Sequence, residues 1–174
     1  MAEYQWPWEY NFPPFFTVQP HAKTKTQQLA TWKSLILDYQ KHCRQAVLNI
    51  NEDSPLFVNE TISRKLPLDG RLWLMEELAK TGNAAPLDKQ RKLQWEIYWH
   101  TLDEWSALIY DWAVANGMTN AVCTIYELVA GENTVGEEFY GLNQDVFKKA
   151  LQILETKGKC ELISFDDNEG VKFF

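Results

Sequence analysis

The chain has 174 residues, of which 45% are hydrophobic and 14% aromatic, including eight tryptophans. This composition excludes an intrinsically disordered chain, whose signature is low hydrophobicity, and it allows one domain or two small ones with real cores. The net charge of −7 comes entirely from residues 101–174, where 5 basic residues stand against 13 acidic ones, whereas residues 1–100 hold 12 and 11.

Residues 1–20 are expected to form an extended N-terminal arm rich in proline and aromatic residues. Pro13 and Pro14 fix their own φ near about −65° and remove two backbone donors, so we expect a polyproline-type segment and not a helix. The rings beside these prolines favour burial; they belong to Phe12, Phe15 and Phe16. Two interpretations stay open: a strap packed on its own domain, or a stiff strip that docks into a groove of another protein.

Two halves of the chain repeat one pattern of helices. Apolar residues spaced i, i+3, i+4, i+7 predict an amphipathic helix over about residues 26–43, and the spacing recurs from Trp105 to Trp112. The second of these helices begins at a capping box, Thr101 to Glu104, and Asn116-Gly117 ends it.

A later helix in each half supports the repeat. A shift of 76 residues aligns Leu66 with Leu142, Asp69 with Asp145, Met75 with Leu151, Leu78 with Leu154, and Gly82 with Gly158. Each glycine precedes a candidate hairpin, whose turn lies at 89–92 in the first half and at 166–170 in the second. Each half also has room for a short strand and a short helix, within 55–65 in the first half and 121–130 in the second.

Helix, strand, helix, helix, hairpin is the winged-helix order. We therefore predict an α+β, mostly helical fold: a docking arm at 1–20, a first winged-helix domain at 21–100 and a second at 101–174. Thr101 is the expected junction, and no Gly/Ser-rich linker separates the halves.

The chemistry of a catalytic, cofactor or metal site is not visible in the sequence. His21, His42 and His100 are far apart and match no ligand spacing, and the glycines form no phosphate-binding pattern. Paired carboxylates at 137–138 and 166–167 fall in expected loops without a hydrophobic shell that would raise a pKa. We predict a protein that is not an enzyme and needs no cofactor or metal.

A winged-helix regulator that binds nucleic acid is the alternative function. Such binding needs several Lys and Arg to neutralise phosphates. The one basic cluster, Lys89, Arg91 and Lys92, is small, and the second half is strongly acidic. The acidic half is interpreted either as a solvated surface or as a docking face for a basic partner.

The expected location is cytosolic. The three cysteines are odd in number and widely spaced, which suits a reducing compartment better than a disulfide framework. No apolar run approaches the roughly 18 residues that cross a bilayer, and the N-terminus lacks a signal-peptide pattern.

The chain resembles the vacuolar protein sorting 25 family, the smallest subunit of the ESCRT-II endosomal sorting complex. The likeness runs over essentially the whole chain, and its most specific part is the arm. It is carried by Trp6-Pro7-Trp8, Tyr10, Phe12 to Thr17, Gln19-Pro20, Leu56-Phe57, Trp105 to Trp112, Thr124 to Leu128, Gly131-Glu132 and Glu138-Phe139.

That resemblance implies two winged-helix domains, no catalysis, and two copies of the chain joined to one copy each of two larger subunits. The family's Pro-Pro-x-aromatic docking motif falls on Pro13, Pro14 and Phe16. An earlier copy of the motif is replaced here by Trp6-Pro7-Trp8-Glu9-Tyr10, which lacks the double proline. The resemblance assigns contact with the larger subunits to Trp6, Trp8, Tyr10, Phe12, Pro13, Pro14, Phe15 and Phe16.

The family's second domain recruits and nucleates ESCRT-III by engaging a helix of its upstream subunit. An acidic surface suits a basic helix, so charge and resemblance agree. The contact residues nominated here are Tyr126, Glu127, Glu132, Glu137 and Glu138. The resemblance also implies recruitment to endosomal membranes for sorting ubiquitinated cargo into multivesicular bodies, with indirect membrane contact through the larger subunits.

Overall fold

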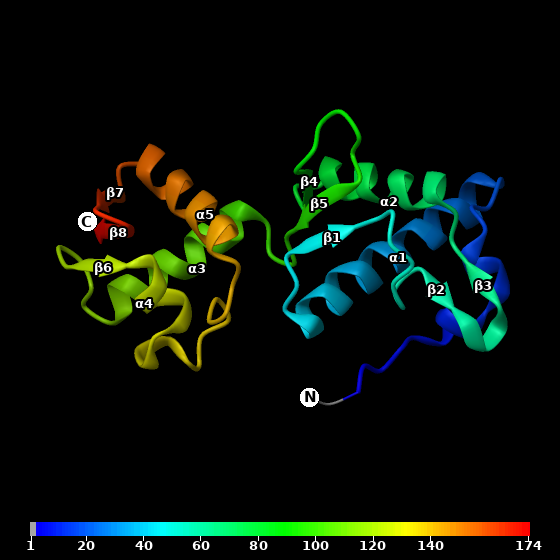
Figure 1. Ribbon diagram of the computed structural model, residues 1–174, viewed down its shortest axis with the longest axis horizontal. Helices are drawn as coiled ribbons and strands as arrows, with labels where there is room; N and C mark the ends of the chain where they lie inside the picture. The colour runs from blue at the N-terminus through cyan, green and yellow to red at the C-terminus, as the bar shows by residue number, and fades with distance from the viewer. Residues whose placement is uncertain (1–2) are drawn as a thin grey trace. The chain divides into compact units, whose positions relative to one another are not determined.

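The computed structural model describes residues 3–174 and divides the chain into two compact units, Met1–Trp99 and His100–Phe174 (Figure 1). Each unit combines helices with a small antiparallel sheet, so the α+β class is confirmed. The unit boundary lies within two residues of Thr101.

The first unit carries two long helices and a three-stranded sheet of order β1-β5-β4. A separate two-stranded hairpin, β2-β3, lies between the helices in the sequence. The elements are α1 (Ala22–Cys43), β1 (Val47–Asn49), β2 (Val58–Asn59), η3 (Glu60–Ile62), β3 (Arg64–Lys65), α2 (Leu68–Lys80), β4 (Ala84–Pro86) and β5 (Gln94–Ile97).

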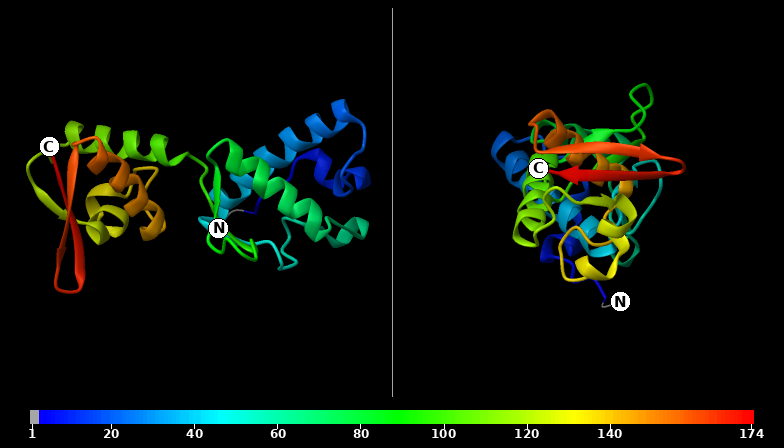
Figure 2. Two further views of the ribbon diagram at one scale, coloured as in Figure 1. Left: turned by 90° about the horizontal axis from the view of Figure 1, so that it is seen from above. Right: turned by 90° about the vertical axis from the view of Figure 1, so that its left-hand side faces the viewer.

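The second unit follows the order helix, strand, helix, helix, hairpin, which is consistent with a winged helix. Its sheet has the order β6-β8-β7, and the β7–β8 hairpin extends well beyond the helices (Figure 2). The elements are α3 (Leu102–Ala115), β6 (Val122–Thr124), α4 (Ile125–Ala130), η4 (Glu132–Thr134), α5 (Gln144–Thr156), β7 (Cys160–Phe165) and β8 (Asn168–Phe173).

The repeat seen in the sequence is also present in the structure. Helices α2 and α5 each have 13 residues, and both of their bounds differ by the 76 residues of the sequence shift. The aligned residues Met75 and Leu151 are both fully buried. Gly82 and Gly158, just beyond the helix ends, both have positive φ, a conformation that glycine adopts without strain.

The capping box that begins α3 is confirmed. The Thr101 hydroxyl accepts a hydrogen bond from the Glu104 backbone N–H at 3.2 Å, and the Glu104 carboxylate accepts one from the Thr101 N–H at 2.9 Å. These two bonds satisfy donors that a helix start leaves free. The hydrogen bond from the Thr101 backbone lowers the pKa of Glu104 below its usual range.

Buried Arg71 joins separate segments of the first unit. Its guanidinium donates to the carbonyl oxygens of Leu66, Ile50 and Glu52 at 2.7–3.1 Å and pairs with Asp53 at 2.9 Å. Lys65 pairs with the other Asp53 oxygen at 2.9 Å. The hydrogen bonds from Lys65 and Arg71 hold the pKa of the Asp53 carboxyl below its usual value.

Two details of the sequence prediction are corrected. The strand of the first sheet is Val47–Asn49, which pairs with β5, and not residues 55–58. Leu56 and Phe57 instead lie in a turn and are fully buried in the core. The turn of the last hairpin is shorter than 166–170, because β8 already begins at Asn168.

The arm is not one continuous extended segment, which is a further correction. It forms two 3-10 turns, η1 (Trp8–Asn11) and η2 (Pro13–Phe16). Pro13 and Pro14 occupy the first positions of η2, where a missing N–H costs nothing and a fixed φ suits a helical turn. Two adjacent prolines therefore disfavour the interior of a helix but are accommodated at its start.

Candidate functional site

Phe15 and Phe16 of the arm pack against α1. The Phe15 ring stacks on Trp32 with centroids 4.2 Å apart and planes 3° from parallel. The Phe15 carbonyl accepts two hydrogen bonds, from Trp32 Nε1 at 2.9 Å and from Gln28 Nε2 at 3.0 Å. Phe16 is only 1% exposed and meets Trp32 edge to face. This contact anchors η2 on the helix.

Tyr10 fastens η1 to the turn before β2. Its hydroxyl donates to the carbonyl oxygens of Pro55 at 2.5 Å and Val58 at 3.0 Å. The Asn59 amide donates to the Tyr10 carbonyl at 2.7 Å. Trp6 covers the other side by stacking on Tyr10, with centroids 3.8 Å apart. Burial raises the pKa of the Tyr10 phenol, so it stays a neutral donor at physiological pH.

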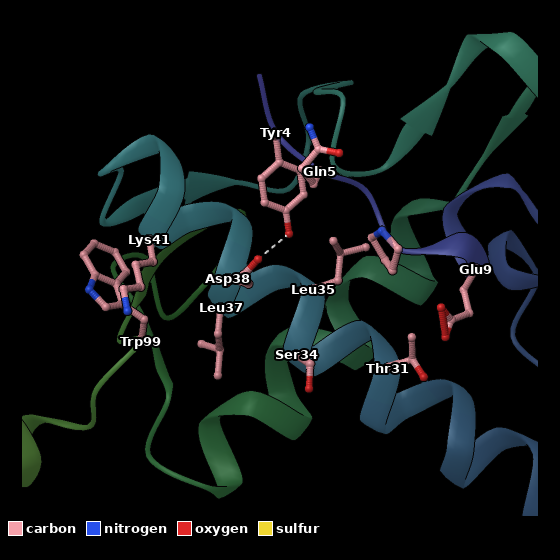
Figure 3. Close-up of a pocket in the computed structure, with 11 residues that line it drawn as sticks. Tyr4, Gln5, Glu9, Thr31, Ser34, Leu35, Leu37, Asp38, Lys41 and Trp99 are labelled. Atoms are coloured by element: carbon pink, nitrogen blue, oxygen red, sulfur yellow. Dashed lines mark hydrogen bonds between the residues drawn. The ribbon is translucent and has the colours of Figure 1, made fainter. Parts of the chain in front are cut away.

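The start of the arm borders an open hollow along α1. The Tyr4 hydroxyl donates to Asp38 at 2.7 Å across one wall (Figure 3). Burial, followed by the bond to Asp38, raises the pKa of Tyr4. The hollow has a volume of about 520 Å³, with Leu35 and Leu37 on the helix side and Trp99 and Lys41 grouped at one end.

The outer side of the arm faces solvent. Trp8 is 71% exposed and Phe12 is 48% exposed, and their ring centroids lie 5.7 Å apart. Pro13 and Pro14 are exposed beside them. A second hollow of about 530 Å³ adjoins these rings and runs between the arm and the first turns of α1; its lining includes Trp8, Phe12, Pro14, Thr24, Gln27 and Thr31.

The predicted arm residues therefore fall into two sets. Tyr10, Phe15 and Phe16 are buried within their own unit and Trp6 is half-buried, so these residues follow the strap interpretation in this conformation. Contact of Phe16 with a partner, which the motif implied, is not possible while its ring is covered. The outer set, Trp8, Phe12, Pro13 and Pro14, is accessible and keeps the docking prediction.

The acidic candidates of the second unit lie on one stretch of chain. Tyr126 and Glu127 are on α4, Glu132 is on η4, and Glu137 and Glu138 follow in the next loop; all five are exposed. Tyr126, at 66% exposure, belongs to the surface and not to the core.

Three contacts hold residues 132–139 against their unit. The Thr134 hydroxyl donates to the Leu128 carbonyl at 2.8 Å, and Phe139 is almost fully buried. The Glu138 carboxylate lies 2.5 Å from Nε2 of His100. Tyr126 on α4 and the carboxylates that follow it along the chain offer an apolar ring and negative charges. Together they can contact both the apolar stem and the charged end of a basic side chain.

Within residues 3–174, no group of three or more His, Cys, Asp and Glu side chains could hold a metal ion. In the same residues no helix is both long enough and apolar enough to cross a membrane. Cys123 and Cys160 are buried, and burial raises the pKa of both thiols, that of Cys160 to about 11.

Sequence reasoning did not single out Gln28 and Asn59, the two buried amides that hold the arm. Gln28 lies four residues before Trp32, on the buried stripe of α1. A polar residue within an apolar helical stripe was the available signal, because a buried amide must find hydrogen-bond partners.

Comparison with known proteins places the chain in one family. Residues 9–143 match the family model described as ESCRT-II complex subunit. Vacuolar protein-sorting-associated protein 25 of Drosophila melanogaster is 50% identical, with all of both chains covered, and that of Homo sapiens is 44% identical over 98% of each. The crystal structure of subunit VPS25 of the endosomal trafficking complex ESCRT-II superposes with a TM-score of 0.84 at 28% identity, covering 95% of this chain and 97% of that one. A crystal structure of the complex ESCRT-II (VPS22/VPS25/VPS36) contains a chain that matches with a TM-score of 0.83 at 28% identity, covering 97% and 98%.

Proposed function

Because this chain belongs to the ESCRT-II complex subunit family, we propose that it is a non-enzymatic adaptor built from two tandem winged helices. Its first unit joins counterparts of VPS22 and VPS36, the proteins named with VPS25 in the solved complex it resembles. Two copies enter each assembly, and their second units recruit ESCRT-III at endosomal membranes during the sorting of ubiquitinated cargo.

The exposure of Trp8 and Phe12 carries this proposal. Both rings face solvent while neighbouring aromatic residues of the same arm are buried, and an open hollow lies beside them. Burying one such ring contributes about 1.5–3 kcal/mol. Pro13 and Pro14, with φ fixed in advance, lose little conformational entropy when a partner covers them. The buried set positions the arm, and the outer set makes the contact.

The test is co-purification of the full-length chain with its VPS22 and VPS36 counterparts. Trp8→Ala/Phe12→Ala should abolish assembly and leave the isolated chain folded, with a cooperative thermal unfolding transition. Val114→Ala is the matched control: its side chain is also exposed, at 52%, but it lies on α3 and should leave assembly intact. Assembly by the double variant at wild-type affinity would refute the docking role.

The acidic stretch Tyr126–Glu138 supports the recruiting role of the second unit. All the carboxylates in this stretch are exposed, and Tyr126 and Val135 offer apolar surface between them. A basic amphipathic helix fits such a mixture, because its lysine and arginine stems cover the apolar side chains while their charged ends meet carboxylates. Two copies in one assembly would present two such faces and gain avidity.

Charge reversal tests this role. Glu127→Lys/Glu132→Lys/Glu137→Lys should weaken binding of the upstream ESCRT-III subunit and reduce the salt dependence of the remaining binding. Asp111→Lys/Asp166→Lys/Asp167→Lys changes the net charge equally at exposed positions outside this stretch and should bind normally. Equal losses in both triple variants would show a general charge effect and no defined face.

A further inference from the structure

A basic loop projects from the first unit between β4 and β5 (Figure 1). We call this loop, residues 87–93, the first wing. The Asp88 carboxylate accepts hydrogen bonds from the backbone N–H groups of Gln90 and Arg91, both at 3.1 Å. The Asp88 carbonyl accepts one from the Lys92 N–H at 2.8 Å. These bonds close the turn, so the backbone that carries its outward side chains is ordered without a partner.

The tip of the first wing carries unpaired positive charge. Lys89 and Arg91 are exposed, and neither forms an ion pair with any of residues 3–174. Lys92 differs, because it lies 3.4 Å from the Glu76 carboxylate. Leu87, 45% exposed, adds an apolar side chain at the base of the tip.

The equivalent loop of the second unit has the opposite charge. We call this loop, residues 165–169, the second wing. Under the 76-residue shift, Lys89 corresponds to Phe165 and Arg91 to Asp167. The second wing also carries Asp166 and Glu169. The same hairpin therefore carries cations in one unit and carboxylates in the other, and only the first wing can approach a negatively charged surface.

We propose that the first wing contacts an anionic lipid surface directly, in place of the purely indirect membrane contact expected from the sequence. A projecting tip can touch a flat surface without a complementary pocket, and the hollows described in the first unit are lined by other residues. In this contact Lys89 and Arg91, at the tip, meet lipid phosphates and carboxylates.

A nucleic acid partner fits the observations less well. A winged helix that binds duplex DNA places its recognition helix in the groove. The helix before the first wing, α2, carries Asp69, Glu76 and Glu77, and its Arg71 is buried among carbonyl oxygens. These carboxylates would lie close to DNA phosphates, whereas a membrane contact made by the tip alone leaves them in solvent.

Vesicle flotation of the full-length chain tests the proposal. Each Lys or Arg near an anionic surface strengthens binding roughly fivefold at low ionic strength, so Lys89→Gln/Arg91→Gln should lower partitioning onto vesicles with about 30% phosphatidylserine by roughly 30-fold. Lys23→Gln/Lys157→Gln removes the same charge from exposed positions outside the wing and should lower partitioning less than about threefold.

Three outcomes would overturn the proposal. The first is wild-type partitioning that is equal on phosphatidylserine and pure phosphatidylcholine vesicles, or absent on both. The second is equal partitioning of the two double variants. The third is loss of duplex DNA binding by the wing variant while its vesicle binding is unchanged, which would identify nucleic acid as the partner. The proposal stands only if partitioning needs both the anionic lipid and the wing cations.

Discussion

Two phenylalanines four residues apart in the arm should respond very differently to truncation. Phe16 is 1% exposed and Phe12 is 48% exposed. Burial of a phenylalanine removes about 150 Å² or more from water, equivalent to about 4 kcal/mol at 25 cal/mol per Å². Phe16→Ala also leaves a cavity against Trp32. We therefore expect it to lower the free energy of unfolding by about 3–5 kcal/mol. Phe12→Ala encloses no cavity and should cost about 1–2 kcal/mol.

Urea unfolding followed by tryptophan fluorescence measures this difference in the first unit, which holds six of the eight tryptophans: Trp6, Trp8, Trp32, Trp73, Trp95 and Trp99. With a slope of about 2 kcal/mol per molar, Phe16→Ala should move the midpoint of the first unit down by about 2 M. The two residues are expected to differ in the opposite sense in partner binding: Phe12→Ala, the variant that stays folded, should lose affinity for the partner. A loss below about 1 kcal/mol for Phe16→Ala would refute the view that the arm is part of the core.

Three further predictions concern other residues. Arg71→Met should lower the free energy of unfolding, measured by urea titration, by about 3 kcal/mol, because it leaves buried carbonyl oxygens without donors. Lys65→Met removes only an exposed partner of Asp53, so it should cost about 1 kcal/mol or less in the same titration. Glu104 has a lowered pKa in the folded state, so its contribution to stability is present above the usual glutamate range and is lost as the pH falls through the lowered value. Glu104→Gln should therefore flatten the acid side of the stability profile of the second unit, and an unchanged profile would contradict the cap's role. Finally, a thiol reagent at pH 8 should label only Cys43 in the native protein and all three cysteines in denaturant; rapid native labelling of Cys160 would show that α5 and β7 open readily.

The sequence predicted best those elements whose cause is local. The bounds of α3 follow from a capping box at Thr101 and a periodic apolar face. The match between α2 and α5 follows from aligned leucines and closing glycines. The signals that define each of these helices lie within about fifteen consecutive residues, so local sequence patterns are sufficient to find them.

Elements that depend on distant partners were missed. Strand β1 has three residues, and only its pairing with β5, more than forty residues away, makes it a strand. The conformation of the arm depends on carbonyl oxygens of Pro55 and Val58, which no local pattern around Tyr10 reveals. For the same reason the sequence indicated aromatic anchors in the arm but could not separate buried Phe15 and Phe16 from exposed Trp8 and Phe12.

The hydrogen bonds of Tyr10 also determine when the arm can fold during synthesis. Since its hydroxyl donates to the carbonyl oxygens of Pro55 and Val58, η1 cannot be held in place until Val58 has left the ribosome. Until then the aromatic side chains of the arm are uncovered, and such segments are prone to aggregation. The arm is therefore made before the turn that binds it, and it can fold only after that turn.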